Sequence, residues 1–323
     1  MVLNILLFIG GLALVLLGAN WLTDGASAVA RRFNINELVI GLTIVAIGTS
    51  LPEFVISMGA ALKGSSGISL GNIVGSNIFN TLFILGVTAF ICPIKFSGKM
   101  LSREIPFNLL AAIALTLIAG GMLYGESGEG QFITRNGGML LLCFLAIFIR
   151  YTFSIAKDGN DNETQEEDAA AAMSIGKATL YIAGGLAALI FGGNIFVDAA
   201  TEIATVIGLS EAVIGITIVS AGSSLPELAV SISAARKGNV GIALGNVLGS
   251  NIFNIFFILG CTATICPIDL SGFNCIDFYV LMSTAVLLYI IAKFGGKTTI
   301  TRAEGAFFTC CYIAYTVYLI MNN

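Results

Sequence analysis

The sequence has 323 residues, of which 57% are apolar and 11% are charged, and its formal net charge is −4. Average soluble domains carry roughly 25% charged residues, whereas uncharged apolar stretches of about 20 residues are typical of segments that cross a bilayer. A large soluble domain is therefore excluded, and we expect an integral membrane protein surrounded by the lipid bilayer. The first apolar stretch lacks the features of a cleaved signal peptide, so we expect it to be retained.

Charges, turn residues and apolar runs predict ten transmembrane helices along the chain. They cover approximately residues 2–28, 37–62, 68–92, 104–124, 134–155, 174–204, 211–235, 242–266, 276–293 and 303–321. Between the fifth and sixth helices lies the only long polar segment, which contains KDGNDNETQEEDAAAA. We interpret it as a solvated linker, with a regulatory role as the alternative.

The basic residues indicate how the helices are oriented. If successive loops alternate between the two sides of the membrane, thirteen of the fifteen basic residues fall on one side, and only Lys63 and Arg135 fall on the other. Loops rich in lysine and arginine mark the cytoplasmic side. We therefore predict a multi-pass protein of the plasma (inner) membrane, with a cytoplasmic linker and both termini outside.

The two halves of the chain repeat each other. A shift of 174 residues aligns 37–94 with 211–268 without a gap, and 38 of the 58 positions are identical. Because each half has five helices, an odd number, the second half must cross the membrane in the opposite sense. The sequence thus predicts an all-α fold of two inverted-topology repeats, 1–155 and 174–323, joined by the linker 156–173. Many secondary transporters have this architecture, with a substrate site near the midplane between the repeats.

Two carboxylates lie deep in the predicted helices. Glu53 and Glu227 occupy equivalent positions in the repeats, and no lysine or arginine lies at a matching depth. A carboxylate at the bilayer centre costs roughly 2.5 to 3.5 kcal/mol on insertion scales, so such residues are kept for a function. A bound cation or protons must supply the countercharge. A protonated group with a purely structural role is the alternative.

Neutral oxygens accompany both glutamates. Pro52 and Pro226 cannot donate a main-chain hydrogen bond, so we expect distorted helices with exposed carbonyl oxygens before each glutamate. Hydroxyl and amide side chains recur at equivalent positions in the two halves: Thr49, Ser50, Ser76 and Asn80 in the first, and Ser223, Ser224, Ser250 and Asn254 in the second. Such a set of hard oxygen ligands suits Ca²⁺ or Na⁺. A hydroxyl in a membrane helix that only bonds to its own backbone is the alternative.

Four glycines flank these residues with GxxxG spacing. They are Gly71, Gly75, Gly245 and Gly249. For these we favour close helix packing over a role in ion binding.

At these positions the sequence resembles the cation/Ca²⁺ exchanger superfamily, and most closely the prokaryotic sodium/calcium antiporters. That superfamily carries G-[TS]-S-x-P-E and G-S-N-I-x-N signatures in two repeats, which read here GTSLPE, GSSLPE, GSNIFN and GSNIFN. The resemblance extends over essentially the whole chain, including the ten predicted helices and the central linker.

The resemblance implies a role for each motif residue. Glu53 and Glu227 would hold ions at the centre, with Thr49 and Ser223 beside them. Flanking sodium sites would be formed by the hydroxyls and main-chain oxygens of Ser50, Ser76, Ser224, Ser250, Ala46 and Ser220. Asn80 and Asn254 would complete the ring. In the sodium/calcium and potassium-dependent members the position of Asn254 is an aspartate, so the departure here puts potassium dependence in question.

The expected function is a secondary antiporter that exchanges Na⁺ for Ca²⁺ by alternating access and extrudes Ca²⁺. A Ca²⁺/H⁺ or K⁺-dependent exchanger on the same fold is the first alternative, and a passive cation channel is the second. We expect no enzymatic activity, since the sequence has no evident nucleophile set or catalytic dyad. We also expect no cofactor, no nucleic-acid ligand and no obligate protein partner.

Overall fold

The structure is a computed structural model that describes residues 2–95, 103–120, 132–157, 173–206, 220–270, 273, 275–294 and 299–322. The chain is mostly helical, as predicted. Within the described residues, 7 helices are long and apolar enough to cross a membrane, or 8 if the pair Glu37–Thr49 and Leu51–Leu62 counts as one broken span. These correspond to eight of the ten predicted helices.

The other two predicted helices are only partly described. The helix expected at 104–124 is observed as Glu104–Ile118, which is apolar but shorter than a full span. The helix expected at 211–235 is observed from Ser220 onward, and its first part lies outside the described residues.

The chain divides into two compact units, and each contains segments from both sequence halves. Unit 1 is Met1–Thr49, Arg150–Gly249 and Ile313–Asn323, and unit 2 is Ser50–Ile149 and Ser250–Tyr312. The compact units therefore do not coincide with the two repeats. For example, the chain passes from unit 1 to unit 2 after Thr49, inside the signature GTSLPE, and again after Gly249, inside the second copy of GSNIFN.

Unit 1 contains both of the longest helices and several short ones. Its elements are α1 (Val2–Arg32), α2 (Glu37–Ile40), the π-helix η1 (Gly41–Val45), α3 (Ala46–Thr49), α11 (Ile175–Val206), α13 (Ser220–Ser223) and α14 (Leu225–Arg236). Three helices contribute residues to both units: α10 (Arg135–Lys157), α15 (Val240–Phe253) and α18 (Arg302–Asn322).

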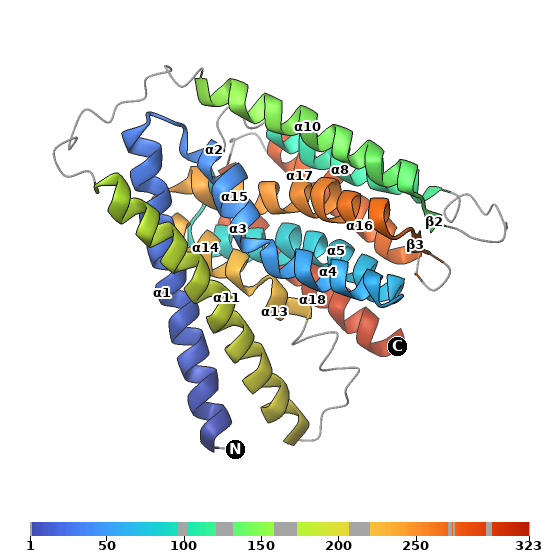
Figure 1. Cartoon of the computed structure of the whole chain (residues 1–323), viewed down its shortest axis with the longest axis horizontal. Coiled ribbons are helices and arrows are strands. Elements are labelled where there is room, and N and C mark those ends of the chain that lie inside the picture. The colour runs from blue at the N-terminus through green and yellow to red at the C-terminus, as the bar shows by residue number, and fades with distance from the viewer. Residues whose placement is uncertain are drawn as a thin grey trace. The chain divides into compact units, whose positions relative to one another are not determined.

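Within unit 1, α1 and α11 pack side by side (Figure 1). A Cβ atom added to Gly18 would lie 2.8 Å from the main-chain oxygen of Gly185, and one added to Gly11 would lie 2.9 Å from that of Gly192. Residue numbers rise along one helix as they fall along the other, so the helices are antiparallel. Glycine at these positions lets the two backbones approach closely.

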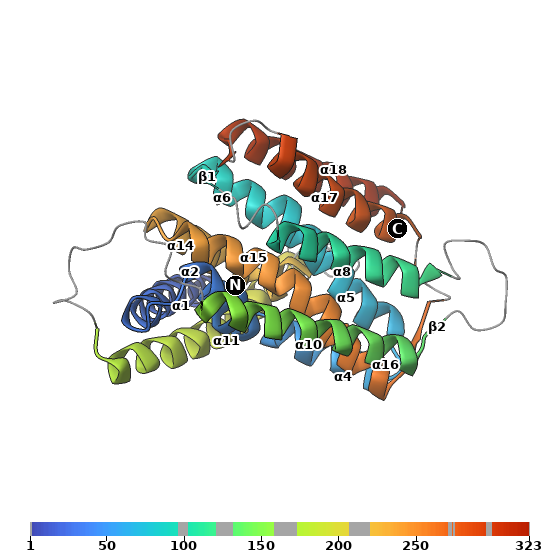
Figure 2. The same ribbon diagram turned by 90° about the horizontal axis from the view of Figure 1, so that it is seen from above.

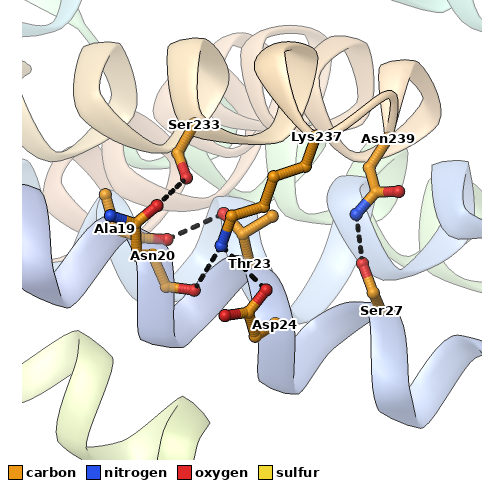
Figure 3. A network of polar contacts seen from close by, with 8 residues as sticks. All are labelled: Ala19, Asn20, Thr23, Asp24, Ser27, Ser233, Lys237 and Asn239. Carbon is orange, nitrogen blue, oxygen red and sulfur yellow. Dashed lines mark hydrogen bonds and ion pairs between the residues drawn. The ribbon is translucent and has the colours of Figure 1, made fainter.

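The same unit joins α1 to α14 through polar side chains (Figure 3). Lys237 Nζ lies 2.7 Å from Asp24 Oδ1 and donates to the main-chain oxygen of Asn20 at 3.1 Å. Ser233 Oγ donates to Asn20 Oδ1 at 2.8 Å, and Asn239 donates to Ser27. These contacts fix the longitudinal position of α1 along the end of α14.

Glycines also bring α15 onto α2 and η1 in unit 1. A Cβ atom on Gly245 would lie 2.6 Å from the main-chain oxygen of Leu38 and 2.8 Å from Gly41 Cα. A Cβ atom on Gly249 would lie 2.9 Å from Leu42 Cα. The packing role expected for these two glycines is confirmed.

Unit 2 is also largely helical. Its elements are α4 (Leu51–Leu62), α5 (Ser66–Ile78), the π-helix η2 (Phe79–Ile84), α6 (Leu85–Ile91), β1 (Ile94–Lys95), α8 (Glu104–Ile118), β2 (Phe132–Ile133), the π-helix η5 (Asn254–Leu259), α16 (Gly260–Ile265), β3 (Ile268–Asp269), α17 (Cys275–Phe294) and β4 (Thr299–Ile300). In this unit α4 contacts α5, η5 and α16, and α8 contacts α17 (Figure 2).

Two short antiparallel strand pairs, which the sequence did not predict, lie in unit 2. Ile94 of β1 pairs with Ile300 of β4, and Ile268 of β3 pairs with Ile133 of β2. Ile94 and Ile268 are equivalent positions of the sequence repeat. In each repeat, a strand follows the third predicted helix. It pairs with the strand that precedes the fifth predicted helix of the other repeat.

Burial separates the helices that carry the signatures from the peripheral ones. Inside the molecule, 78% of the most apolar window of Ser66–Ile91 and 94% of that of Val240–Ile265 are buried. The corresponding shares are 22% for Val2–Arg32 and 28% for Ile175–Val206. We interpret the exposed apolar surfaces of α1 and α11 as lipid-facing, while the polar signature residues are protected from lipid.

Candidate functional site

The helix breaks immediately before each deep glutamate. The chain leaves helical geometry at Ser50, with φ −83° and ψ 6°, and at Ser224, with φ −93° and ψ 11°, and a new helix follows each serine. Pro52 and Pro226 lie in the first turn of these new helices, where a missing main-chain donor is tolerated. The expected distortion is confirmed, but it is a complete break rather than a bend in a continuous helix.

This break places both carboxylates in the first turn of a helix. Glu53 lies in the first turn of α4 and Glu227 in that of α14, and each side chain is 1% exposed. The positive end of the helix dipole stabilises a negative charge at this position, by up to about 2 kcal/mol in partly buried sites. The dipole thus favours ionised glutamates in an interior where no basic side chain was expected.

Each glutamate turn is tied to a neighbouring helix by an asparagine that the sequence reasoning missed. Asn72 Nδ2 on α5 donates to the main-chain oxygen of Glu53 at 3.3 Å and to Ser57 Oγ at 2.9 Å. Asn246 Nδ2 on α15 makes the equivalent bonds, at 3.1 Å to Glu227 and 3.0 Å to Ser231. The signal was present in the sequence, because both asparagines lie inside the repeated GNxxGSN block.

The helices that carry the second signature change to π-helix at its final asparagine. In the first repeat η2 begins at Phe79 and includes Asn80, and in the second η5 begins at Asn254. A π-helical turn widens the helix and is frequent at functional sites. Hydrophobic periodicity does not distinguish such turns from α-helix, so the sequence did not predict them.

Buried polar side-chain atoms of this second signature lack hydrogen-bond partners among the described residues. They include Ser76 Oγ, Ser250 Oγ, Asn254 Oδ1 and both polar atoms of the Asn80 amide. Leaving a buried polar atom unsatisfied costs roughly 1 to 3 kcal/mol, so each such atom calls for an explanation. A bound cation would supply the missing partner for the oxygen atoms.

Four of these signature residues and Glu53 belong to unit 2, on elements that pack together. α4 carries Glu53, α5 carries Ser76, and both helices contact η5, which begins at Asn254. Phe54 on α4 stacks on Phe257 of η5 with ring centroids 5.4 Å apart. Glu53 therefore lies on a helix that contacts elements carrying unsatisfied neutral oxygens.

Unit 1 holds the other glutamate and the remaining candidates. Thr49, Ser223, Ser224 and Glu227 are buried in it, and α14 contacts α3, whose first residue is the buried Ala46. Thr49 Oγ1 donates to Asn246 Oδ1 at 3.1 Å. Ser50, also buried, directly follows Thr49 and is assigned to unit 2. Of Ser220 only the backbone is described, at the start of α13.

Another buried carboxylate, which the sequence did not indicate, lies in unit 2. Glu104, the first residue of α8, is 1% exposed, because α8 packs against α17 and η5. Its place at the start of a predicted helix made it look accessible from the sequence. Among the described residues, no group of three or more histidine, cysteine, aspartate or glutamate residues could hold a metal ion.

Comparison with known proteins shows which family the chain resembles. A family profile described as "Sodium/calcium exchanger protein" matches residues 3–154 and 177–321. The sodium/calcium exchanger MaX1 of Methanosarcina acetivorans is 32% identical, and the match covers 98% of each chain. The inner membrane protein YrbG of Escherichia coli is 34% identical, with 99% of this chain and 97% of YrbG covered.

A solved structure of the sodium-calcium exchanger NCX_Mj, soaked with zero Na⁺ and Ca²⁺, has a TM-score of 0.81 to this chain. The two sequences are 34% identical, and the match covers 98% of this chain and 99% of NCX_Mj. Whole-length similarity in both sequence and fold accompanies the signature residues described above. The chain therefore belongs to the sodium/calcium exchanger family.

Proposed function

We propose that the protein is a secondary antiporter that exchanges Na⁺ for Ca²⁺ by alternating access and extrudes Ca²⁺. One arrangement, present in both repeats, carries the proposal. A buried glutamate lies in the first turn of one helix, and the helix that follows along the chain carries buried serine and asparagine side chains. Two carboxylates balance the charge of one Ca²⁺, and neutral oxygens can complete the six to eight ligands that Ca²⁺ takes. The relatives named as sodium/calcium exchangers support the choice of ions.

The proposed ligands are the twelve residues that the sequence indicated. Glu53 and Glu227 supply the charge, and Thr49 and Ser223 supply hydroxyls beside them. The remaining side-chain and main-chain oxygens come from Ser50, Ser76, Ser224, Ser250, Asn80, Asn254, Ala46 and Ser220. The unsatisfied oxygens of Ser76, Ser250 and Asn254 support this set. Na⁺ and Ca²⁺ are substrates here, and we propose neither a cofactor nor an enzymatic reaction.

The proposed architecture is ten transmembrane helices in two inverted repeats, with a cytoplasmic linker and both termini outside. The antiparallel packing of α1 and α11, which are the first helices of the two halves, supports the inversion. The pairing of β1 with β4 and of β3 with β2 supports it as well, since exchanging the repeats converts one pair into the other. The distribution of basic residues supports the orientation.

Calcium uptake into everted membrane vesicles tests the proposed function. Vesicles that contain the protein and are loaded with Na⁺ should take up Ca²⁺, and uptake should collapse when Na⁺ is equal on both sides. A proton-coupled exchanger would instead follow a pH gradient, and a channel would let Ca²⁺ equilibrate without any second gradient. Vesicles from cells without the protein are the control.

We expect exchange that does not require K⁺, because Asn254 is neutral where potassium-dependent members have an aspartate. Asn254→Asp is nearly isosteric and adds one negative charge to a site for cations. The variant should fold and should change its cation dependence or its apparent Ca²⁺ affinity, by about tenfold if the new charge gains roughly 1.4 kcal/mol of interaction. The assay is Na⁺-driven Ca²⁺ flux with and without K⁺, at fixed ionic strength and clamped voltage. Wild-type flux that stops without K⁺ would contradict this expectation.

Alternating access requires one part of the protein to move against another, and we propose that α1 slides along the end of α14 during each cycle. Asn20 and Ser233 are in contact across these helices, so cysteines at both positions should form a crosslink in a background without the native cysteines. Oxidation should then stop turnover, reduction should restore it, and Ca²⁺ binding should persist throughout. The single variants Asn20→Cys and Ser233→Cys are the controls. Undiminished turnover by the crosslinked protein would exclude this motion.

A further inference from the structure

Asn246 uses every polar atom of its side-chain amide within unit 1. Its Nδ2 atom donates to the main-chain oxygen of Glu227 at 3.1 Å and to Ser231 Oγ at 3.0 Å. Its Oδ1 atom accepts from Thr49 Oγ1 at 3.1 Å. The side chain is fully buried, so water does not compete for these bonds, and they are stronger than they would be at a surface.

These bonds settle which way the amide and the hydroxyl point. A main-chain oxygen can only accept, so the NH₂ group of Asn246 must face Glu227 and its oxygen must face Thr49. The amide oxygen also can only accept, so the Thr49 hydroxyl must donate its single hydrogen to it. The competing contact from Thr49 to the main-chain oxygen of Ala46 is longer, at 3.4 Å, and therefore weaker.

A threonine hydroxyl that donates to Asn246 presents only its lone pairs in the remaining directions. A cation ligand needs this orientation, because a hydroxyl hydrogen that points at a cation is repelled by it. We infer that Asn246 is a positioning residue that fixes the Thr49 hydroxyl as an acceptor for a divalent cation, Ca²⁺. Through its NH₂ group it also holds the first turn of α14, where Glu227 lies. The inference rests on the proposed function of the same site.

The need for both donors and an acceptor explains why an asparagine lies here. An ionised aspartate could accept from Thr49 but could not donate to the main-chain oxygen of Glu227, and a leucine could do neither. Asn72 makes the two equivalent donor bonds in unit 2, to Glu53 and Ser57. The chain therefore builds this link to the glutamate turn twice.

Calcium binding to the purified full-length protein, measured by isothermal titration in buffer without Na⁺, tests the inference. Thr49→Val and Asn246→Leu should each weaken Ca²⁺ binding about tenfold, the factor expected for one buried hydrogen bond or ligand contact. The double variant should be no weaker than the worse single variant, because both changes remove the same oriented hydroxyl. Ser231→Ala, which removes only the hydroxyl that accepts from Asn246 Nδ2 and leaves the contact between Asn246 and Thr49 in place, is the matched control and should stay within about twofold of wild type.

Two outcomes would overturn the inference: wild-type affinity in Asn246→Leu, or losses in the two single variants that multiply in the double variant. A loss in Ser231→Ala as large as that in Asn246→Leu would also overturn it, because Asn246 would then act only by joining helices. If Asn246→Leu does not fold, Asn246→Asp takes its place, because it retains the acceptor oxygen. Adding Thr49→Val to Asn246→Asp should still weaken Ca²⁺ binding about tenfold. An affinity that Thr49→Val leaves unchanged in this background would equally refute the inference. Wild-type protein that binds no Ca²⁺ would instead refute the proposed function itself.

Discussion

Replacing Glu53 or Glu227 with glutamine is expected to abolish exchange while leaving a folded protein in the membrane. Each substitution preserves the shape of the side chain and removes one of the two buried charges proposed to bind the ion. Contacts with charged groups are worth up to about 3 kcal/mol, so Ca²⁺ affinity should fall by about 100-fold or more. The measurements are Na⁺-driven Ca²⁺ flux and direct Ca²⁺ binding, with membrane content checked by quantitative blotting.

A surface carboxylate provides the control for this prediction. Glu202 lies on α11 and is exposed, so Glu202→Gln makes the same chemical change outside the proposed site and should leave flux unchanged. Near-normal exchange by Glu53→Gln or Glu227→Gln would show that the carboxylate concerned does not bind the transported ion. Loss of protein from the membrane would mean that the carboxylate is required for folding, which the dipole argument does not predict.

The second large effect concerns Gly245, on α15, with the exposed Gly10, on α1, as its control. A Cβ atom on Gly245 would lie 2.6 Å from the main-chain oxygen of Leu38, whereas one on Gly10 would meet no described atom within 4 Å. Overpacking against backbone costs roughly 1 to 3 kcal/mol or more. Alanine in place of an unpacked helix glycine gains about 1 kcal/mol of helix propensity.

Gly245→Ala should therefore lower the thermal stability of the purified protein by several degrees or prevent its accumulation. Gly10→Ala should be neutral or slightly stabilising. Thermal aggregation of the detergent-solubilised variants, followed by size-exclusion chromatography, distinguishes the two. Equal destabilisation by both substitutions would mean that the close approach of α15 to α2 does not exist in the membrane.

The glycine spacing also shows how far the sequence could predict the packing. The GxxxG spacing correctly indicated close packing for Gly245 and Gly249. It did not indicate which helix these glycines would meet, because the neighbour of a motif depends on the tertiary fold.

The boundaries of most helices followed from charge and hydropathy, because crossing a bilayer demands long apolar segments. Local chemistry made the helix breaks predictable, since Pro52 and Pro226 cannot continue a helix. The π-helical turns at Asn80 and Asn254 were not predictable, because hydrophobic periodicity does not distinguish them from α-helix. The two-residue strands were missed because they are too short to produce a periodic signal.

For the candidate site, residue types predicted the ligands better than the contacts between them. The sequence indicated Glu53, Glu227 and the accompanying oxygens, and all of those whose side chains are described are buried. We did not single out Asn72 and Asn246, although both lie in the repeated GNxxGSN block, because their importance lies in hydrogen bonds to another helix. Burial of Glu104 was likewise missed, since it depends on tertiary packing around α8.

The central claim is that a Na⁺ gradient drives Ca²⁺ movement through this protein. The most direct measurement uses the purified protein in liposomes, with internal Na⁺, external Ca²⁺ and the membrane voltage clamped. Only the Na⁺ gradient or the pH gradient is varied, and Glu53→Gln liposomes serve as the inactive control. We expect Ca²⁺ uptake that requires internal Na⁺, stops when Na⁺ is equal on both sides, and is unaffected by a pH gradient alone. Uptake that ignores Na⁺ and follows the pH gradient would contradict the account.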